Sequence, residues 1–157
     1  MDTNDIKALR LLQHEGRASW SRLGELLGMT GPAAAERVRR LEERGIIRGF
    51  TALIDPESVG LTLTAFIALS LEKPIHREAF LKLVQTLPEI QECHHCTGED
   101  DYLLKVRCRG VSDLDRVINT ELKSLSGVLR TRTTIVMRTS KDSHAVALNA
   151  AAKAARQ

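Results

Sequence analysis

Residues 30–50 read TGPAAAERVRRLEERGIIRGF, and this stretch has the start, the stop and the two faces of a single helix. Thr30 is suited to cap the first turn with its hydroxyl, and Pro32 is suited to a first turn, where its missing N–H is not needed. Gly45 fits the left-handed position that ends a helix. The buried face is predicted from an apolar stripe at helical spacing, namely Ala34, Val38 and Leu41.

A neighbouring stripe of the same helix carries one small residue followed by arginines: Ala33, Arg37, Arg40 and Arg44. Small residues at the front and cations behind are typical of a helix whose N-terminal end enters a DNA major groove. The alternative is a solvated helix whose arginines only pair with Glu36, Glu42 and Glu43, because charge runs are usually exposed surface.

The residues before this helix favour the DNA interpretation. A first helix is predicted before Gly16, and a second begins at the cap residue Ser19 and ends at Gly28. Two short helices joined by a tight glycine-containing turn form a helix-turn-helix, whose core the first helix completes. Residues 46–54 are β-branched and apolar enough to predict a short wing strand.

The composition limits the classes of protein to consider. A chain of 157 residues allows one domain or two small ones, and 43% hydrophobic residues suffice for a core. An aromatic fraction of 3% disfavours a base-stacking single-strand binder, and three cysteines disfavour a disulfide framework. We find no apolar run of membrane-spanning length and no signal-like N-terminus, so we expect a cytoplasmic protein.

After a turn at Asp55-Pro56, the hydrophobic pattern changes to alternating strands and helices in the order βαββαβ. This order predicts a ferredoxin-like, four-stranded antiparallel sheet with both helices on one face. The first strand, from Leu63, is apolar on both faces, so we expect a second subunit to cover the open face in a symmetric dimer.

The predicted fold class is therefore α+β. It consists of an N-terminal winged helix-turn-helix, with three helices plus a short wing strand, followed by a ferredoxin-like βαββαβ domain. The predicted divisions are residues 1–54 for DNA binding, 55–62 as linker, 63–140 for ligand sensing and dimerisation, and an alanine-rich tail at 141–157. We assign the tail no function.

In this order the motifs resemble the Lrp/AsnC ("feast/famine") family of transcription regulators over about residues 5–139. They are Glu15-Gly16-Arg17, Arg37-Val38-x-Arg40-Leu41-Glu42-x-x-Gly45-Ile46-Ile47, Asp55-Pro56 with Gly60, Glu92-Cys93, Thr97-Gly98 and Asp101-Tyr102-Leu103-Leu104-Lys105-Val106. The resemblance implies double-stranded DNA as a partner and a homodimer through the C-terminal sheets, often assembled into a tetramer or octamer. It also implies a small effector, usually an amino acid, at the hairpin loop Thr97–Asp101.

For DNA, we expect the front of the helix to lie nearest the base edges, with Thr30, Pro32, Ala33 and Glu36. Arg37 is predicted to reach a guanine edge or a phosphate, and phosphates are assigned to Arg40, Arg44 and Arg48. Glu36 has an alternative as the intrahelical partner of Arg40 at i+4. The stretch 31–35 is poorer in hydrogen-bonding side chains than many family members, which shifts specificity towards DNA shape.

For the effector, the loop offers groups that suit an α-amino acid. Gly98 lets a ligand approach the backbone, Thr97 supplies a hydroxyl, and Glu99 and Asp101 supply charge for an ammonium group. His95 is placed to line the side-chain pocket. The structural alternative is that Gly98 only turns the hairpin and Asp101 only caps it.

The alternative function is a metal- or thiol-responsive regulator that uses Cys93-His94-His95-Cys96, because thiolates and imidazoles bind zinc and other soft metals. Alternation along a strand points Cys93 and His95 to one face and the other two to the opposite face, which disfavours a shared site. We therefore predict no metal and no cofactor. We also predict no enzyme, because the chain lacks an activated nucleophile, a phosphate-binding glycine loop and paired carboxylates on rigid elements.

Overall fold

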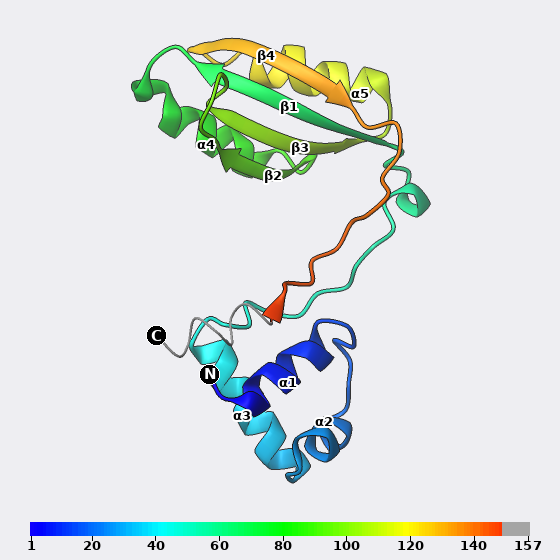
Figure 1. Cartoon of the computed structure of the whole chain (residues 1–157). Coiled ribbons are helices and arrows are strands. Elements are labelled where there is room, and N and C mark those ends of the chain that lie inside the picture. Colours follow the sequence, from blue (N-terminus) through cyan, green and yellow to red (C-terminus); the bar gives the residue numbers. More distant parts are fainter. Residues whose placement is uncertain (149–157) are drawn as a thin grey trace. The chain divides into compact units, whose positions relative to one another are not determined.

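The computed structural model describes residues 1–148 and separates them into two compact units (Figure 1). Of the described residues, one unit comprises 1–53 and 141–148, and the other comprises Ile54–Ser140. The domain limits predicted at residues 54, 62 and 140 stay predictions. Most of the predicted tail, residues 149–157, lies outside the described residues.

The first unit is built from α1 (Thr3–Leu12), α2 (Trp20–Leu27) and α3 (Gly31–Glu43). Each helix begins at a side-chain cap: Asp2, Ser19 and Thr30 accept a hydrogen bond from the third residue of their helices. The apolar stripes of the three helices meet in one core, formed by Ala8, Leu12, Leu23, Leu27, Ala34 and Val38. The predicted helix-turn-helix with its supporting helix is confirmed.

The turn between α2 and α3 depends on two glycines. Gly28 ends α2 with a φ of +67°, as predicted. Gly24 was not singled out in the sequence, yet a Cβ atom there would lie 2.7 Å from the carbonyl oxygen of Met29 and 3.0 Å from the backbone nitrogen of Gly31. The missing side chain of Gly24 is therefore what lets the turn pack directly against α2.

The predicted wing strand at residues 46–54 is wrong for this structure, which assigns no strand there. After Gly45, with a φ of +67°, the amides of Ile46 and Ile47 both donate to the carbonyl oxygen of Leu41, at 2.9 and 3.1 Å. These bonds complete the C-terminal cap of α3, so the two isoleucines end the helix instead of starting a ladder. A strand also needs a paired neighbour, and residues 49–54 are exposed with no ladder partner in the described chain.

The second unit is a four-stranded antiparallel sheet in the order β2-β3-β1-β4. Its strands are β1 (Leu63–Leu71), β2 (Ile90–His95), β3 (Tyr102–Cys108) and β4 (Val128–Ile135). Helix α4 (Arg77–Thr86) connects β1 to β2, and α5 (Val111–Asp115), continued by a π-helical segment at Arg116–Leu122, connects β3 to β4. Short 3₁₀ turns lie at Glu57–Val59 and Pro74–His76. The predicted βαββαβ order is confirmed.

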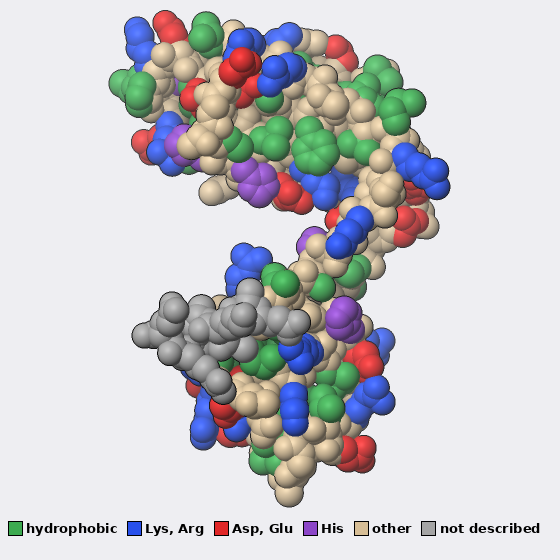
Figure 2. Space-filling view, viewed as in Figure 1, with side chains coloured by type: hydrophobic (Ala, Val, Ile, Leu, Met, Phe, Trp, Pro, Cys, Tyr) green, Lys and Arg blue, Asp and Glu red, His purple; other side chains and the backbone are tan. Residues whose placement is uncertain are grey.

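Both helices cover the same face of the sheet, as Figure 1 shows. The core on that face includes Ile67 of β1, Phe80 of α4, Leu104 of β3 and Val117 of the π-helical segment, all fully buried. The open face carries half-buried apolar side chains along the two central strands: Phe66, Ala68 and Leu103. Figure 2 shows hydrophobic side chains gathered on this face with charged residues around them.

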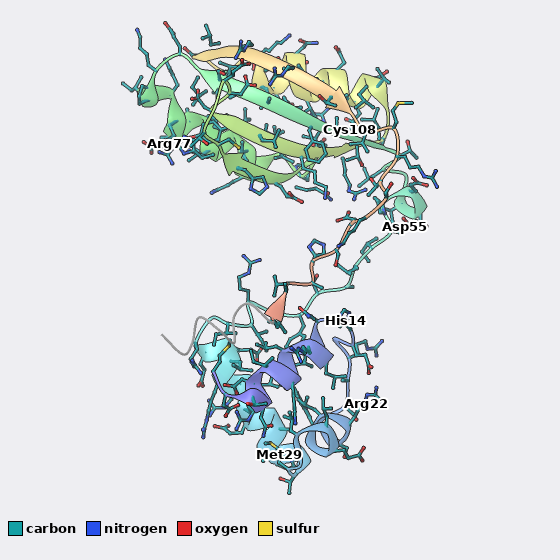
Figure 3. The ribbon with its side chains drawn as sticks, in the orientation of Figure 1. His14, Arg22, Met29, Asp55, Arg77 and Cys108 are labelled. Carbon is teal, nitrogen blue, oxygen red and sulfur yellow. The ribbon has the colours of Figure 1, made fainter. Side chains whose placement is uncertain are left out.

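The chain between α3 and β1 contains the predicted turn at Asp55 (Figure 3). Oδ2 of Asp55 accepts a hydrogen bond from the backbone N–H of Ser58 at 2.9 Å, and Gly60 ends the turn with a φ of +84°. No helix among residues 1–148 is long and apolar enough to cross a membrane.

We expect Gly24→Ala to destabilise the helix-turn-helix by about 1–3 kcal/mol, because the added methyl group meets backbone atoms that move only with the turn. Urea unfolding followed by the fluorescence of Trp20, the single tryptophan of the chain, measures this loss. Gly16→Ala is the matched control. Its Cβ atom would lie 3.7 Å from the carbonyl oxygen of Leu12, an ordinary contact, so we expect a change within about 0.5 kcal/mol. Equal midpoints for the two variants would contradict the close approach at Gly24.

Candidate nucleic-acid interface and effector loop

The front of α3 is capped and exposed. Oγ1 of Thr30 accepts a hydrogen bond from the backbone N–H of Ala33 at 3.4 Å, and Pro32 occupies the first turn. The side chains of these three residues face solvent, whereas the opposite stripe of the helix is buried in the core: Ala34, Val38 and Leu41. The N-terminal end of α3 is thus available to an external groove, which is what major-groove docking requires.

Glu36 lies between two arginines of its own helix. Nε and Nη2 of Arg39 donate to the carboxylate at 2.8 and 2.7 Å, and Nε of Arg40 donates to it at 3.0 Å. The hydrogen bond from Arg39, followed by that from Arg40, lowers the pKa of Glu36 to about 2. Of the two alternatives for Glu36, the intrahelical ion pair is the one that this structure contains.

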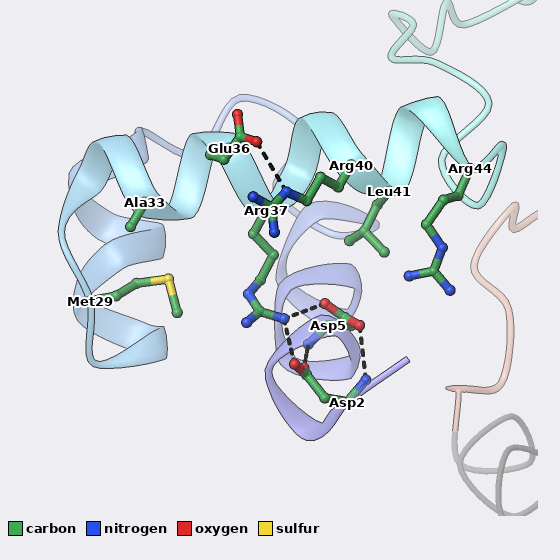
Figure 4. Close-up of a pocket in the computed structure, with 9 residues that line it drawn as sticks. All are labelled: Asp2, Asp5, Met29, Ala33, Glu36, Arg37, Arg40, Leu41 and Arg44. Carbon is green, nitrogen blue, oxygen red and sulfur yellow. Dashed lines mark hydrogen bonds and ion pairs between the residues drawn. The ribbon is translucent and has the colours of Figure 1, made fainter.

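Arg37, which was predicted to reach a guanine edge or a phosphate, turns its side chain towards the N-terminus of α1 in this structure (Figure 4). Its Nη1 atom donates to Oδ2 of Asp2 at 2.7 Å and to Oδ1 of Asp5 at 2.5 Å. Only 27% of the Arg37 side chain is exposed. The predicted base or phosphate contact is therefore not available to Arg37 in this conformation, because two carboxylates of the same chain already hold its guanidinium group.

The other predicted phosphate-binding arginines stay at the surface. Arg40 is 69% exposed although it shares the Glu36 carboxylate. Arg44 at the end of α3 and Arg48 beyond it are exposed, and neither side chain makes a hydrogen bond or ion pair with another described residue. These two side chains are free to take an external anion.

Asp2 and Asp5 were not predicted as parts of this interface. Their spacing at the start of α1 indicates a capping box, which they do form, with backbone-to-carboxylate distances of 2.7 and 2.8 Å. Nothing in that local pattern predicts an arginine more than thirty residues away. The only feature of the sequence that relates to this contact is the acidic N-terminus, which contains Asp2 and Asp5.

The hairpin loop between β2 and β3 exposes Thr97, Gly98 and Glu99. Gly98 has a φ of +128°, a conformation that suits glycine. Oδ2 of Asp101 accepts a hydrogen bond from the backbone N–H of Leu71 at 2.8 Å. Gly98 and Asp101 therefore have the structural roles of turning and tying the hairpin, and an added role in ligand binding stays a prediction.

His95 lies on the helix-covered face of the sheet, where its ring centroid is 5.0 Å from that of Tyr102. The side chain is exposed, and it stands at the end of β2 next to the loop. The structure thus brings His95 to the base of the loop that carries the other four predicted effector residues.

A carboxylate that the sequence analysis missed holds this loop to β4. Asp100 has a side chain that is 9% exposed, and its two oxygens accept from Arg130 at 3.1 Å and from Arg132 at 2.7 Å. Arg130 also donates to the carbonyl oxygen of Glu99 at 3.0 Å, and the hydroxyl of Ser70 lies 3.2 Å from Asp100. The loop backbone is thereby fixed by charges on a neighbouring strand.

The cysteines give no support to a metal- or thiol-responsive protein. Cys93 packs against the helix-side core, while Cys96 donates its thiol to the carbonyl oxygen of His94 at 3.6 Å. Residues 1–148 bring together no group of three or more histidine, cysteine, aspartate or glutamate side chains able to hold a metal ion. Burial raises the pKa of the Cys93 thiol and raises that of Cys108 to about 11, which disfavours reactive thiolates.

Two known family models match this chain, one over the helical unit and one over the sheet unit. Residues 1–42 match the AsnC-type helix-turn-helix domain, and residues 64–146 match the Lrp/AsnC ligand-binding domain. The leucine-responsive regulatory protein of Haemophilus influenzae is 38% identical over 150 residues, which cover 94% of this chain and 90% of the relative. That of Escherichia coli K12 is 40% identical over 146 residues, covering 92% and 89%.

Solved structures extend the likeness to the whole fold. A transcriptional regulator of Neisseria meningitidis, solved in complex with L-methionine, superimposes with a TM-score of 0.92 at 34% identity, covering 96% of this chain and 99% of that one. The leucine response regulatory protein of Mycobacterium tuberculosis gives a TM-score of 0.80 at 32% identity, covering 90% and 96%. With both domains matched in sequence and the whole chain matched in structure, this protein belongs to the Lrp/AsnC family of transcriptional regulators.

Proposed function

We propose that this regulator places the exposed front of α3 in the major groove of double-stranded DNA. The observation that carries the proposal is the capped N-terminal end of α3, where Thr30, Pro32 and Ala33 face solvent. Base edges are contacted by these residues, and phosphates are contacted by Arg40, Arg44 and Arg48. Glu36 orients Arg39 and Arg40, because its carboxylate receives hydrogen bonds from both.

A second copy of the chain completes the regulator by packing on the open face of the sheet. The half-buried Phe66, Ala68 and Leu103 supply the apolar centre of that face. Charged pairs lie around them, among them Lys105 with Glu92 at 3.1 Å. An apolar centre with a polar rim is the composition of a subunit interface. The homodimer presents two recognition helices to one DNA site, and higher homo-oligomers, a tetramer or an octamer, extend the same arrangement.

The effector is an α-amino acid bound at the hairpin loop. Glu99 and Asp101 supply negative charge for its ammonium group, and the exposed backbone at Thr97 and Gly98 is open to its carboxylate. His95 borders the side-chain pocket. Support comes from the leucine-responsive relatives and from the meningococcal structure solved with L-methionine.

Catalysis is not part of this function. The family consists of transcriptional regulators, and we infer that this member regulates by binding DNA in the cytoplasm without carrying out a reaction.

Loss of one phosphate contact per subunit tests the DNA interface. In Arg44→Gln, we expect the slope of log K against log salt to become shallower by roughly 2 per dimer, because each neutralised phosphate contributes about one released counterion. Fluorescence anisotropy on a duplex from the upstream region of its own gene measures the slope. Arg77→Gln, which removes an exposed arginine from α4 of the other unit, is the control and should leave the slope unchanged. A slope that is the same in both variants would exclude Arg44 from the interface.

A thermal-shift screen against the twenty amino acids tests the effector loop. A ligand at ~100 times its dissociation constant should stabilise the fold by about 2.7 kcal/mol. Asp101→Asn should abolish this shift, because it removes the charge and keeps an oxygen that accepts from the N–H of Leu71. Asp115→Asn, at an exposed position on α5, is the control and should keep the shift. A shift of full size in Asp101→Asn would show that the effector binds elsewhere.

A further inference from the structure

A groove of about 470 Å³ runs between α3 and the N-terminus of α1 (Figure 4). Its α3 side carries three cations, Arg37, Arg40 and Arg44, and its α1 side carries the carboxylates of Asp2 and Asp5. Figure 4 shows the side chain of Arg37 extending into this groove, where the two carboxylates meet it. The groove therefore has one cationic wall, and carboxylates of the same chain face that wall from the other side.

The two carboxylates differ in how firmly they are held. Asp5 has a side chain that is 9% exposed, whereas that of Asp2 is 58% exposed. Oδ1 of Asp2 caps α1 by accepting from the amide of Asp5, and its other oxygen, Oδ2, contacts Arg37. An exposed ion pair contributes little to stability, while a charge left without its partner in a buried site costs several times more. The bond from Arg37 to Asp2 is consequently the one that opens at low cost.

Arg37 also has unused donor capacity. Both of its ion pairs are made by Nη1, and its Nε and Nη2 atoms donate to no other described residue. A guanidinium group offers its donors in a planar fork that matches a phosphate better than it matches two separate carboxylates. An entering phosphate can thus use donors that Asp2 and Asp5 leave free.

We propose that this groove binds a phosphate of the DNA backbone, for which Arg37 gives up its bond to Asp2. The inference rests on the proposed docking of α3 on DNA. Asp5 keeps Arg37 anchored to α1, Arg44 faces the same phosphate from the end of α3, and Asp2 is the competing anion. Because phosphate contacts carry no sequence information, the competition by Asp2 weakens binding to DNA of every sequence. Weaker non-specific binding leaves more of the regulator free for its own sites.

A double-mutant cycle in the full-length protein without an N-terminal tag tests this competition. Asp2→Asn removes the charge and keeps an oxygen that caps α1. The cycle comprises the parent, Asp2→Asn, Arg37→Gln and the double variant, each titrated by anisotropy with a random-sequence duplex at several salt concentrations. In the parent background, we expect Asp2→Asn to tighten binding about five- to tenfold at 0.1 M salt and to steepen the salt slope by roughly 1 per subunit. In the Arg37→Gln background, the same change should have an effect of less than about twofold, from long-range charge alone.

An equal effect of Asp2→Asn in the two backgrounds would overturn the proposal, and so would no effect in either. If Arg37→Gln fails to fold, as judged by Trp20 fluorescence, Arg37→Lys takes its place. Because a lysine keeps one charge and loses the fork, Asp2→Asn should then tighten binding less than in the parent, and an effect as large as in the parent would overturn the proposal. The result is separable from the docking of α3 itself. A shallower salt slope in Arg44→Gln, together with an unchanged Asp2→Asn, would leave the docking in place and remove only the competition.

Discussion

The arrangement of the DNA-binding unit depends on the ion pair between Arg37 and the two carboxylates at the start of α1. This pair joins the recognition helix to a segment more than thirty residues earlier. Its inner half, with Asp5, is buried, so removal of either partner would leave an uncompensated charge. The outer half, with Asp2, is exposed and exchanges easily. One arginine therefore ties α3 to α1, and its outer bond is the one that we propose is exchanged for a phosphate of the DNA.

The sheet unit contains a similar three-residue ion pair, in which the charges are reversed. Asp100 is nearly buried between Arg130 and Arg132, so here a carboxylate is held by two cations. Its position next to Glu99 and Asp101 fixes the loop to which we assign the effector. Because Ser70 pairs with Arg130 in the sheet register and lies on the open face, the clamp connects that loop to the face on which we place the second subunit.

The sequence was sufficient for the parts of the fold that depend on local pattern. Helical spacing predicted the buried stripe of α3. Gly28 and Gly45 marked the ends of α2 and α3, and alternation predicted the strands of the βαββαβ unit. The wing strand was mispredicted because Ile46 and Ile47 are apolar enough for a strand, yet their amides are taken by Leu41 in the helix cap. The strand propensity of a residue does not tell which carbonyl group its amide will bond to in the folded chain.

The candidate sites were less predictable, because their key contacts are long-range. Asp2 and Asp5 form a local capping box, but the arginine that they also hold lies on another helix. Likewise, Asp100 meets its arginines only when β4 pairs with β1. Gly24 was missed for the opposite reason: a glycine inside a helix gives no signal until the turn that packs on it is known.

The charge pairing on α3 also limits the contacts with which we propose that this regulator distinguishes DNA sequences. Residues 36–44 contain four arginines and three glutamates, so most of the positive charge is neutralised within the chain. Arg39 bonds to Glu36 and Glu43, and Arg37 bonds to the acids of α1, which leaves few cations for phosphates. The front of the helix offers mainly alanines, which make apolar contacts and few directional bonds to bases. For a recognition helix with few free cations and few base donors, we propose that the fit of paired subunits to the shape and bending of the duplex adds to the specificity of the base contacts. That contribution gives the subunit interface a direct part in sequence recognition.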